Sequence, residues 1–157
     1  MRIISLDPSI NNTGFAVFMG KDLETYGTAR SKGTDTGAKL VSLISCLPNG
    51  PFDHAVIEKP PKFSYARSSR FGKTLNAEAM GKLHIAIGSL IYFFAFKGIS
   101  VIEVDVMQWK GKQPKSLTMQ NVRHFFGIEV KNDHVSDAIM LGHWWLSKQN
   151  IFKRIKT

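Results

Sequence analysis

Two short apolar segments that each end in an acidic residue constrain the fold of this chain most. Residues 2–7, RIISLD, are β-branched and apolar and end in Asp7. Residues 54–60, HAVIEKP, lead through a similar run to Glu58, and two prolines then stop strand pairing. Both segments predict short buried strands with a carboxylate at the carboxyl end, the edge where α/β sheets usually carry their chemistry.

The remaining segments predict further strands and helices around these two. Strand-like runs occur at 13–19, at about 23–30 and at 99–104, and the Asn-Asn-Thr-Gly break before the first of them predicts a β-hairpin. Helices are expected at about 36–47, 76–97, 116–126 and 133–148, with Ser116 capping the third. This order predicts an α/β fold, a mixed five-stranded sheet in which an antiparallel meander adjoins parallel strands, flanked by helices.

Length and composition predict one globular unit. The chain has 157 residues, of which 43% are hydrophobic, and it shows no internal repeat or linker. We therefore expect a single domain over residues 1–157, with a basic, frayed tail at 148–157.

The same features indicate an intracellular protein. The single cysteine, Cys46, excludes an internal disulfide framework and an all-cysteine metal site. The start of the chain lacks the long apolar core of a signal peptide. The most apolar run, residues 85–96, is interrupted by Gly and Ser and is shorter than a membrane span, so no transmembrane helix is expected.

The charge of the chain points to a polyanionic partner. Lys and Arg number 21 against 12 Asp and Glu, which gives a net charge of +9. Much of the excess lies in two segments, where cations can neutralise phosphates and aromatic rings can stack on unpaired bases. The predicted DNA contacts are Lys59, Lys62, Phe63, Tyr65, Arg67, Arg70 and Lys73 in the first segment, and Lys110, Lys112 and Lys115 in the second. A solvated loop is the alternative for the first segment.

The last predicted helix supplies further acidic residues. In NDHVSD, three polar side chains lie within one helical turn, namely Asp133, His134 and Asp137. Carboxylates with one imidazole suit Mg²⁺ or Mn²⁺, and two such ions can clamp the attacking and leaving oxygens of a phosphodiester. Each residue taken alone could instead be a turn or capping residue. Together with Asp7, Glu58 and the basic charge, they favour a metal-dependent site that acts on phosphates.

Three motifs, in this order, resemble those of the RuvC-type Holliday-junction resolvases, within the ribonuclease H-like superfamily. LDPSINNTGFAVF is similar to the first motif, AVIEKP to the second and HVSDAIMLGHW to the final helix. The resemblance extends from residue 3 to about residue 145. The residues that carry it are Asp7, Thr13, Gly14, Glu58, His134 and Asp137.

The resemblance implies a ribonuclease H-like fold and a homodimeric endonuclease. Such an enzyme binds four-way DNA junctions and cuts two strands symmetrically with Mg²⁺ or Mn²⁺, two ions per active site. The resemblance gives metal and catalytic roles to Asp7, Glu58, His134 and Asp137. Whether His134 is a ligand or the base for the attacking water stays open, and so does the choice between Asp133 and His134.

The resemblance also implies roles for the two basic segments. The family keeps lysines in the second, and from them we expect Lys115 to stabilise the charge that builds on the phosphate. An aromatic residue of the first is expected to enter the junction as a wedge, and we choose Phe63, with Tyr65 behind it.

The helix predicted at 76–97 is apolar on two sides, which favours a dimer. One side would cover the sheet, and the other would form a twofold contact that fixes the separation of two active sites. The contact is expected around Ala79, Ala86, Ile87 and Phe93. A monomer with a deeply buried helix is the alternative.

Departures from the family pattern leave the substrate open. The basic loop after Glu58 is longer than usual, and WKGKQPK is more similar to phage-encoded relatives. The alternatives are a nuclease for flaps and other branched DNA, a ribonuclease H that cuts hybrids, and a DNA-binding module without activity. The opening motif also resembles the phosphate loop of actin-like ATPases and sugar kinases, whose two-domain cleft needs a longer chain. We expect a role in recombination, repair or phage genome processing, in the cytoplasm of a bacterial or phage-infected cell and without a membrane partner.

Overall fold

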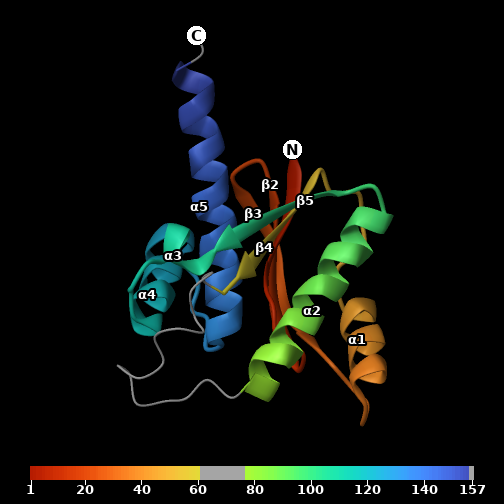
Figure 1. Ribbon diagram of the computed structural model, residues 1–157. Helices are drawn as coiled ribbons and strands as arrows, with labels where there is room; N and C mark the ends of the chain where they lie inside the picture. Colours follow the sequence, from red (N-terminus) through yellow and green to blue (C-terminus); the bar gives the residue numbers. More distant parts are fainter. Residues whose placement is uncertain (61–76, 156–157) are drawn as a thin grey trace.

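A computed structural model describes residues 1–60 and 77–155 of the chain (Figure 1). Its centre is a five-stranded sheet with the order β3-β2-β1-β4-β5. The strands are β1 (Arg2–Asp7), β2 (Asn12–Met19), β3 (Asp22–Arg30), β4 (His54–Lys59) and β5 (Ser100–Asp105). The first three strands pair antiparallel, and β1, β4 and β5 pair parallel. The predicted α/β fold with its mixed sheet is confirmed.

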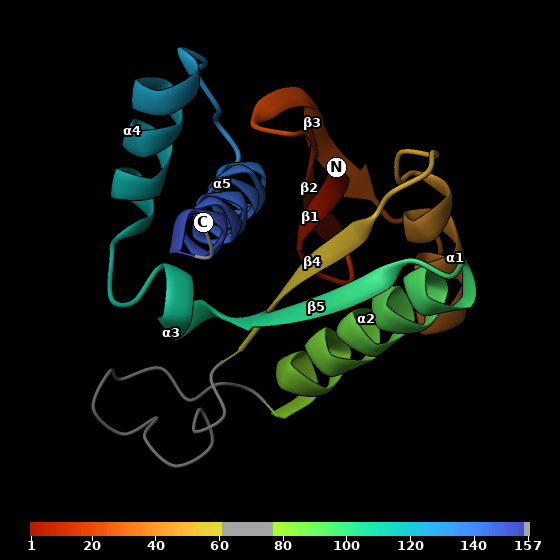
Figure 2. The same cartoon turned by 90° about the horizontal axis from the view of Figure 1, so that it is seen from above.

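Helices cover both faces of the sheet (Figure 2). On one face lie α1 (Thr36–Ser45) and α2 (Ala77–Phe96), and on the other lies α5 (Asp133–Ile155), with α4 (Lys115–Phe126) packed against it. Alternate residues of β1 point to the two faces, so Ile3 joins the core beneath α5 while Ile4 and Leu6 join the core beneath α1 and α2. The central strands β1 and β4 are therefore buried on both faces, and each carries an acidic side chain at or near its carboxyl end.

The first turns of α5 lie directly on β1 and β2. A Cβ atom at Gly14 would collide with the backbone carbonyl of His134, and one at Gly142 would lie 2.6 Å from the Ser5 hydroxyl oxygen. The buried Ser5 hydroxyl donates a hydrogen bond to the Ala138 carbonyl at 2.7 Å. The two glycines thus permit a contact that brings the start of α5 beside the carboxyl end of β1.

The segment after β5 holds an element that we did not predict. It is a one-turn helix, α3 (Val106–Trp109). The turn has a capping box: the Asp105 side chain accepts from the Met107 N–H, and the Gln108 side chain accepts from the Asp105 N–H. A helix this short leaves no hydrophobic period, which is why the sequence pattern did not reveal it.

The ends of two other helices also differ from the predictions. The cap position of α4 is held by Pro114 without a side-chain hydrogen bond, so the prediction that Ser116 caps this helix is wrong. Helix α5 continues to Ile155, past the expected end at Lys148, so the backbone is helical in most of the segment where a frayed tail was expected.

Helix α2 is apolar on both sides, but two of the four residues expected at the dimer contact face the sheet instead. It packs on the sheet through Met80, Ala86, Ile87, Leu90 and Phe94. Ala86 and Ile87 are therefore unavailable for the predicted dimer contact, and the exposed apolar residues are instead Ile85, Tyr92 and Phe96. Among the described residues, α2 is the one helix long and apolar enough to cross a membrane, a test that core helices of soluble proteins also pass.

Candidate active site

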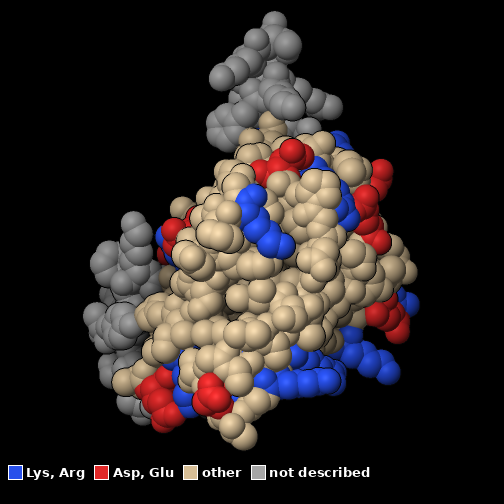
Figure 3. Space-filling view, turned by 90° about the vertical axis from the view of Figure 1, so that its right-hand side faces the viewer, with Lys and Arg blue, Asp and Glu red and all other residues tan. Residues whose placement is uncertain are grey.

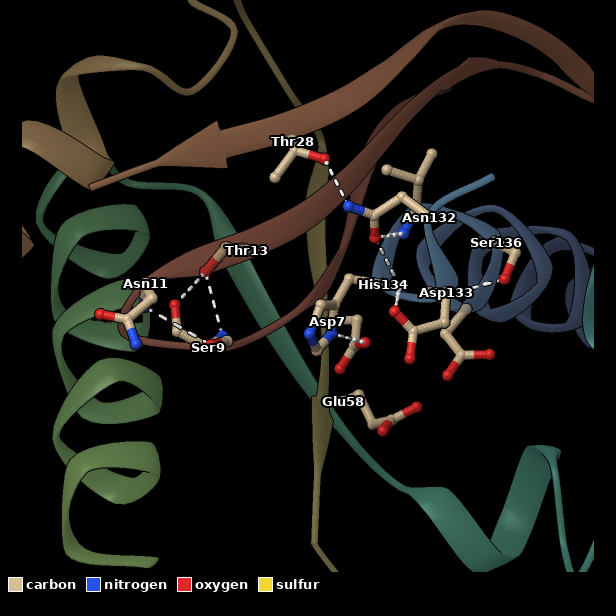
Figure 4. A network of polar contacts seen from close by, with 12 residues as sticks. Asp7, Ser9, Asn11, Thr13, Thr28, Glu58, Asn132, Asp133, His134 and Ser136 are labelled. Carbon is tan, nitrogen blue, oxygen red and sulfur yellow. Dashed lines mark hydrogen bonds and ion pairs between the residues drawn. The ribbon is translucent and has the colours of Figure 1, made fainter. Parts of the chain in front are cut away.

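Acidic residues from two strands and one helix meet at one edge of the sheet (Figure 4). Asp7 ends β1, and Glu58 is the next-to-last residue of β4, the parallel neighbour of β1. Asp137 lies in the second turn of α5, the helix that packs across β1 and β2. The predicted convergence of these carboxylates is thus present in the structure.

His134 joins the cluster through Asp7. Its Nδ1 lies 2.7 Å from Oδ2 of Asp7, whereas Asp133 accepts a hydrogen bond from the backbone N–H of His134. The start of α5 is held by Asn132, whose side-chain oxygen accepts from the same N–H at 2.9 Å and whose amide donates to Thr28 on β3. His134 therefore contacts Asp7 directly, and Asn132 is a positioning residue that the sequence interpretation missed.

Two residues of the α3 segment reach the other carboxylates. The Lys110 ammonium lies 2.5 Å from both carboxylate oxygens of Asp137, and both side chains are only 9% exposed. The indole N–H of Trp109 donates to Glu58 at 2.8 Å. We predicted Lys110 as a DNA contact and gave Trp109 no role in the site, whereas the structure places both inside the carboxylate site. Their position directly after β5 is the signal that could have identified them, because β5 ends at the same edge as β4.

Burial and mutual repulsion make two of these carboxyl groups, those of Asp7 and Glu58, hard to ionise. Burial, together with repulsion from Asp7 and Asp137, raises the pKa of Glu58 to about 8, although the Trp109 hydrogen bond and Lys110 lower it. Burial also raises the pKa of Asp7, and its contact with His134 offsets only part of this effect. The site is short of positive charge.

The donor set suits a hard divalent cation. Three carboxylates and one imidazole are the ligands that Mg²⁺ or Mn²⁺ would take from this edge, and the raised pKa values show that further positive charge would be stabilising. In the described part of the chain, no three acidic or histidine side chains are arranged as ligands around one metal position. Each instead contacts another side chain: Asp7 contacts His134, Glu58 accepts from Trp109, and Asp137 pairs with Lys110. Lys110 supplies the positive charge next to Asp137, so a metal ion could take Asp137 as a ligand only if Lys110 moved away.

The other predicted site residues lie at the edge of this cluster or outside the described residues. Lys59 is paired with Glu103 on β5 at 3.3 Å, and Lys112 is exposed after α3. Lys115 begins α4, but its side chain is outside the described part of the chain. The same holds for all of Lys62, Phe63, Tyr65, Arg67, Arg70 and Lys73. Their predicted roles stay predictions.

Comparison of the structure with solved structures identifies the fold. No protein-family model and no curated protein matches the sequence. A structure of Thermus thermophilus RuvC in complex with a Holliday junction substrate matches with a TM-score of 0.71 and 17% identity, over 92% of each chain. The chain has the fold of RuvC. A second Thermus thermophilus RuvC structure matches with a TM-score of 0.67 and 18% identity, over 96% of this chain and 97% of that one.

A viral resolvase has the same fold. The fowlpox virus Holliday junction resolvase matches with a TM-score of 0.59 and 14% identity, over 95% of this chain and 99% of its own. These matches confirm the predicted ribonuclease H-like sheet over nearly the whole length of the chain.

The raised pKa of Glu58 predicts how stability depends on pH in the metal-free protein. The pKa of Glu58 is about 8 in the folded chain against 4.5 ordinarily. Its contribution to the free energy of unfolding is therefore complete below pH 4.5 and is lost as the pH rises towards 8. Asp7 acts in the same direction. We expect the Tm in EDTA to fall by several degrees from about pH 5 to about pH 8.5, and to fall less in Glu58→Gln, which cannot ionise.

Thermal melts followed by circular dichroism measure this difference. Glu103→Gln is the matched control, because Glu103 is an exposed acid on the neighbouring strand, and it should keep the wild-type slope. An equal fall of Tm with pH in the wild type and in Glu58→Gln would contradict the raised pKa of Glu58.

Proposed function

We propose that this chain is a metal-dependent, structure-selective DNA endonuclease that resolves four-way junctions by paired, symmetrical phosphodiester hydrolysis. The observation that carries the proposal is the convergence of Asp7, Glu58 and Asp137 at one edge of a sheet with the RuvC fold. Support for the substrate comes from two sources. The net charge is +9, and the two neighbours of this fold include structures with Holliday junction DNA.

The four predicted catalytic residues have distinct tasks in this proposal. Asp7, Glu58 and Asp137 would hold Mg²⁺ or Mn²⁺, two ions per site, with His134 at their border. When bound, the ions supply Lewis-acid stabilisation of the phosphate and an activated water. The His134 ring, held by Asp7, either completes the ligand set or accepts the proton of the attacking water.

Lys110 has the position required for charge stabilisation at the phosphate. Its ammonium is already within the carboxylate cluster, paired with Asp137. Displaced from Asp137 by a cation, it stays next to the site and can interact with a phosphate oxygen. Among the described side chains it fits the role that the family resemblance led us to expect of Lys115.

The basic loop that follows Glu58 is proposed to contact the branch point. It leaves β4 at the carboxylate site itself, and Lys59 is its first cation. Lys62, Arg67, Arg70 and Lys73 would neutralise phosphates there. Phe63 would be the wedge, with Tyr65 behind it.

We further propose that α2 forms a homodimer contact through its outer face. Ile85, Tyr92 and Phe96 are 47%, 69% and 78% exposed, and the rings of Tyr92 and Phe96 stack with centroids 5.9 Å apart. Figure 3 views the molecule from the side that carries α1 and α2 and shows a broad surface with few charged side chains. An apolar surface of this kind suits a second copy, and a twofold pair places two active sites for symmetrical cutting.

Sedimentation of a charge variant tests the dimer. We expect a dimeric wild type and a monomeric Tyr92→Glu, because the new carboxylate would be buried at the contact. Tyr26→Glu, on exposed strand β3, is the matched control and should stay dimeric. A monomeric wild type, or a dimeric Tyr92→Glu, would contradict this contact.

Cleavage of synthetic DNA tests the proposed activity. A four-way junction, linear duplex, flap and RNA:DNA hybrid are compared in Mg²⁺, Mn²⁺ and EDTA. We expect paired symmetrical nicks in the junction with either metal and none in EDTA. Asp7→Asn should lower the cleavage rate by about 100-fold or more, since it removes the negative charge of a proposed metal ligand.

The matched control and the other substrates make the outcome decisive. Asp22→Asn makes the same change at an exposed strand residue and should leave cleavage unchanged. Preferred cutting of the flap would identify a debranching nuclease, and cutting of the hybrid a ribonuclease H. Binding of the junction without cutting would leave only a DNA-binding module.

A further inference from the structure

A concave part of the surface lies beside the carboxylate site, between α4, α5 and the α3 segment. It is a pocket of about 250 Å³. Four aromatic rings line it, those of Trp109, Phe125, His143 and Trp144. Of these four rings, the carboxylate site uses Trp109 alone, through the indole N–H that donates to Glu58.

The polar groups of this pocket suit a flat, hydrogen-bonding ring. Gln113 and Asn121 carry amides, each with donor and acceptor groups of the kind that pair with base edges. Thr118 lines the pocket at 2% exposure, and its hydroxyl has no hydrogen-bond partner among the described residues. A buried hydroxyl without a partner costs free energy unless a bound molecule satisfies it.

Charge at the rim distinguishes between possible occupants. The Lys148 ammonium lies 6.0 Å from the centre of the Trp144 ring, and the Lys110 ammonium 5.5 Å from that of Trp109. Lys110 is buried in its pair with Asp137, whereas Lys148 is exposed beside the Trp144 ring. A cation on this side of the pocket suits an aromatic group that carries an anion, as a base does with its phosphate. An apolar peptide side chain would use the rings but neither the amides nor Lys148.

The pocket is coupled to the carboxylate site through one side chain. The Trp109 ring is part of the pocket wall, and its N–H donates to Glu58. Along α5, Asp137 and Trp144 are seven residues apart, a rise of about 10 Å. A strand whose phosphate lies at the carboxylates could therefore place a nearby base in the pocket.

We propose that this pocket binds one unpaired nucleobase of the DNA strand whose phosphate lies at the carboxylate site. The proposal rests on the proposed function and deepens it, because a base read here would make cleavage depend on the sequence at the branch point. The rings provide stacking, while Gln113 and Asn121 read the edge of the base. Burial and the nearby charge of Lys21 lower the pKa of His143, so its ring faces the base in the neutral form.

Fluorescence of a labelled junction tests the binding. Four-way junctions carry 2-aminopurine at single positions around the crossover and are bound by the uncleaving Asp7→Asn protein in Mg²⁺. We expect emission to change at a fixed position near the scissile phosphate. Adding Asn121→Ala or Phe125→Ala to this protein should abolish the change, whereas Gln120→Ala, an exposed neighbour on α4 outside the pocket, should retain it.

Cleavage of junctions with different crossover sequences gives a second readout. In proteins with Asp7 intact, Asn121→Ala and Phe125→Ala should lower the ratio between the best and worst sequences by about threefold or more, and Gln120→Ala should not. If the cleavage ratios stay unchanged and the emission change survives both Asn121→Ala and Phe125→Ala, the proposal that this pocket binds a base is overturned, whatever the activity. An emission change that depends on the pocket, in a protein whose wild type cuts no DNA, would support the pocket and overturn the proposed function.

Discussion

Three carboxylates at one sheet edge, two of them buried and one half-buried, favour a positive partner, and the site is organised around it. Burial and repulsion raise the pKa values of Asp7 and Glu58 even with Lys110 in place. Lys110 provides the charge by pairing with Asp137. A buried ion pair costs desolvation of both groups, so its presence at this position is better explained by function than by stability. The same preference for positive charge makes the edge suitable for divalent cations.

The carboxylates meet because α5 sits unusually close to the sheet. Gly14 and Gly142 leave room for the helix backbone, and the Ser5 hydroxyl bonds to it. Asn132 then fixes the first turn, which directs His134 towards Asp7. Packing of one helix thus determines the geometry of the site, and the α3 segment completes it through Trp109 and Lys110.

Much of this arrangement was predictable from the sequence, for identifiable reasons. Asp7 and Glu58 end apolar strands, and parallel neighbours bring such ends to one edge. Asp137 and His134 follow from helical spacing. Lys110 was misjudged because a cation in a basic segment looks like a surface residue, and the one-turn helix before it has no period to read. The outer contact of α2 was partly misjudged, since a helix that is apolar all round does not reveal which residues face the sheet.

The most direct test of the carboxylate site is a crystal structure of the protein with Mn²⁺, located by its anomalous scattering. The account predicts Mn²⁺ bound by oxygens of Asp7, Glu58 and Asp137, with the Lys110 ammonium moved out of contact with Asp137. An intact Lys110–Asp137 pair with no Mn²⁺ at this edge, at millimolar metal, would contradict it.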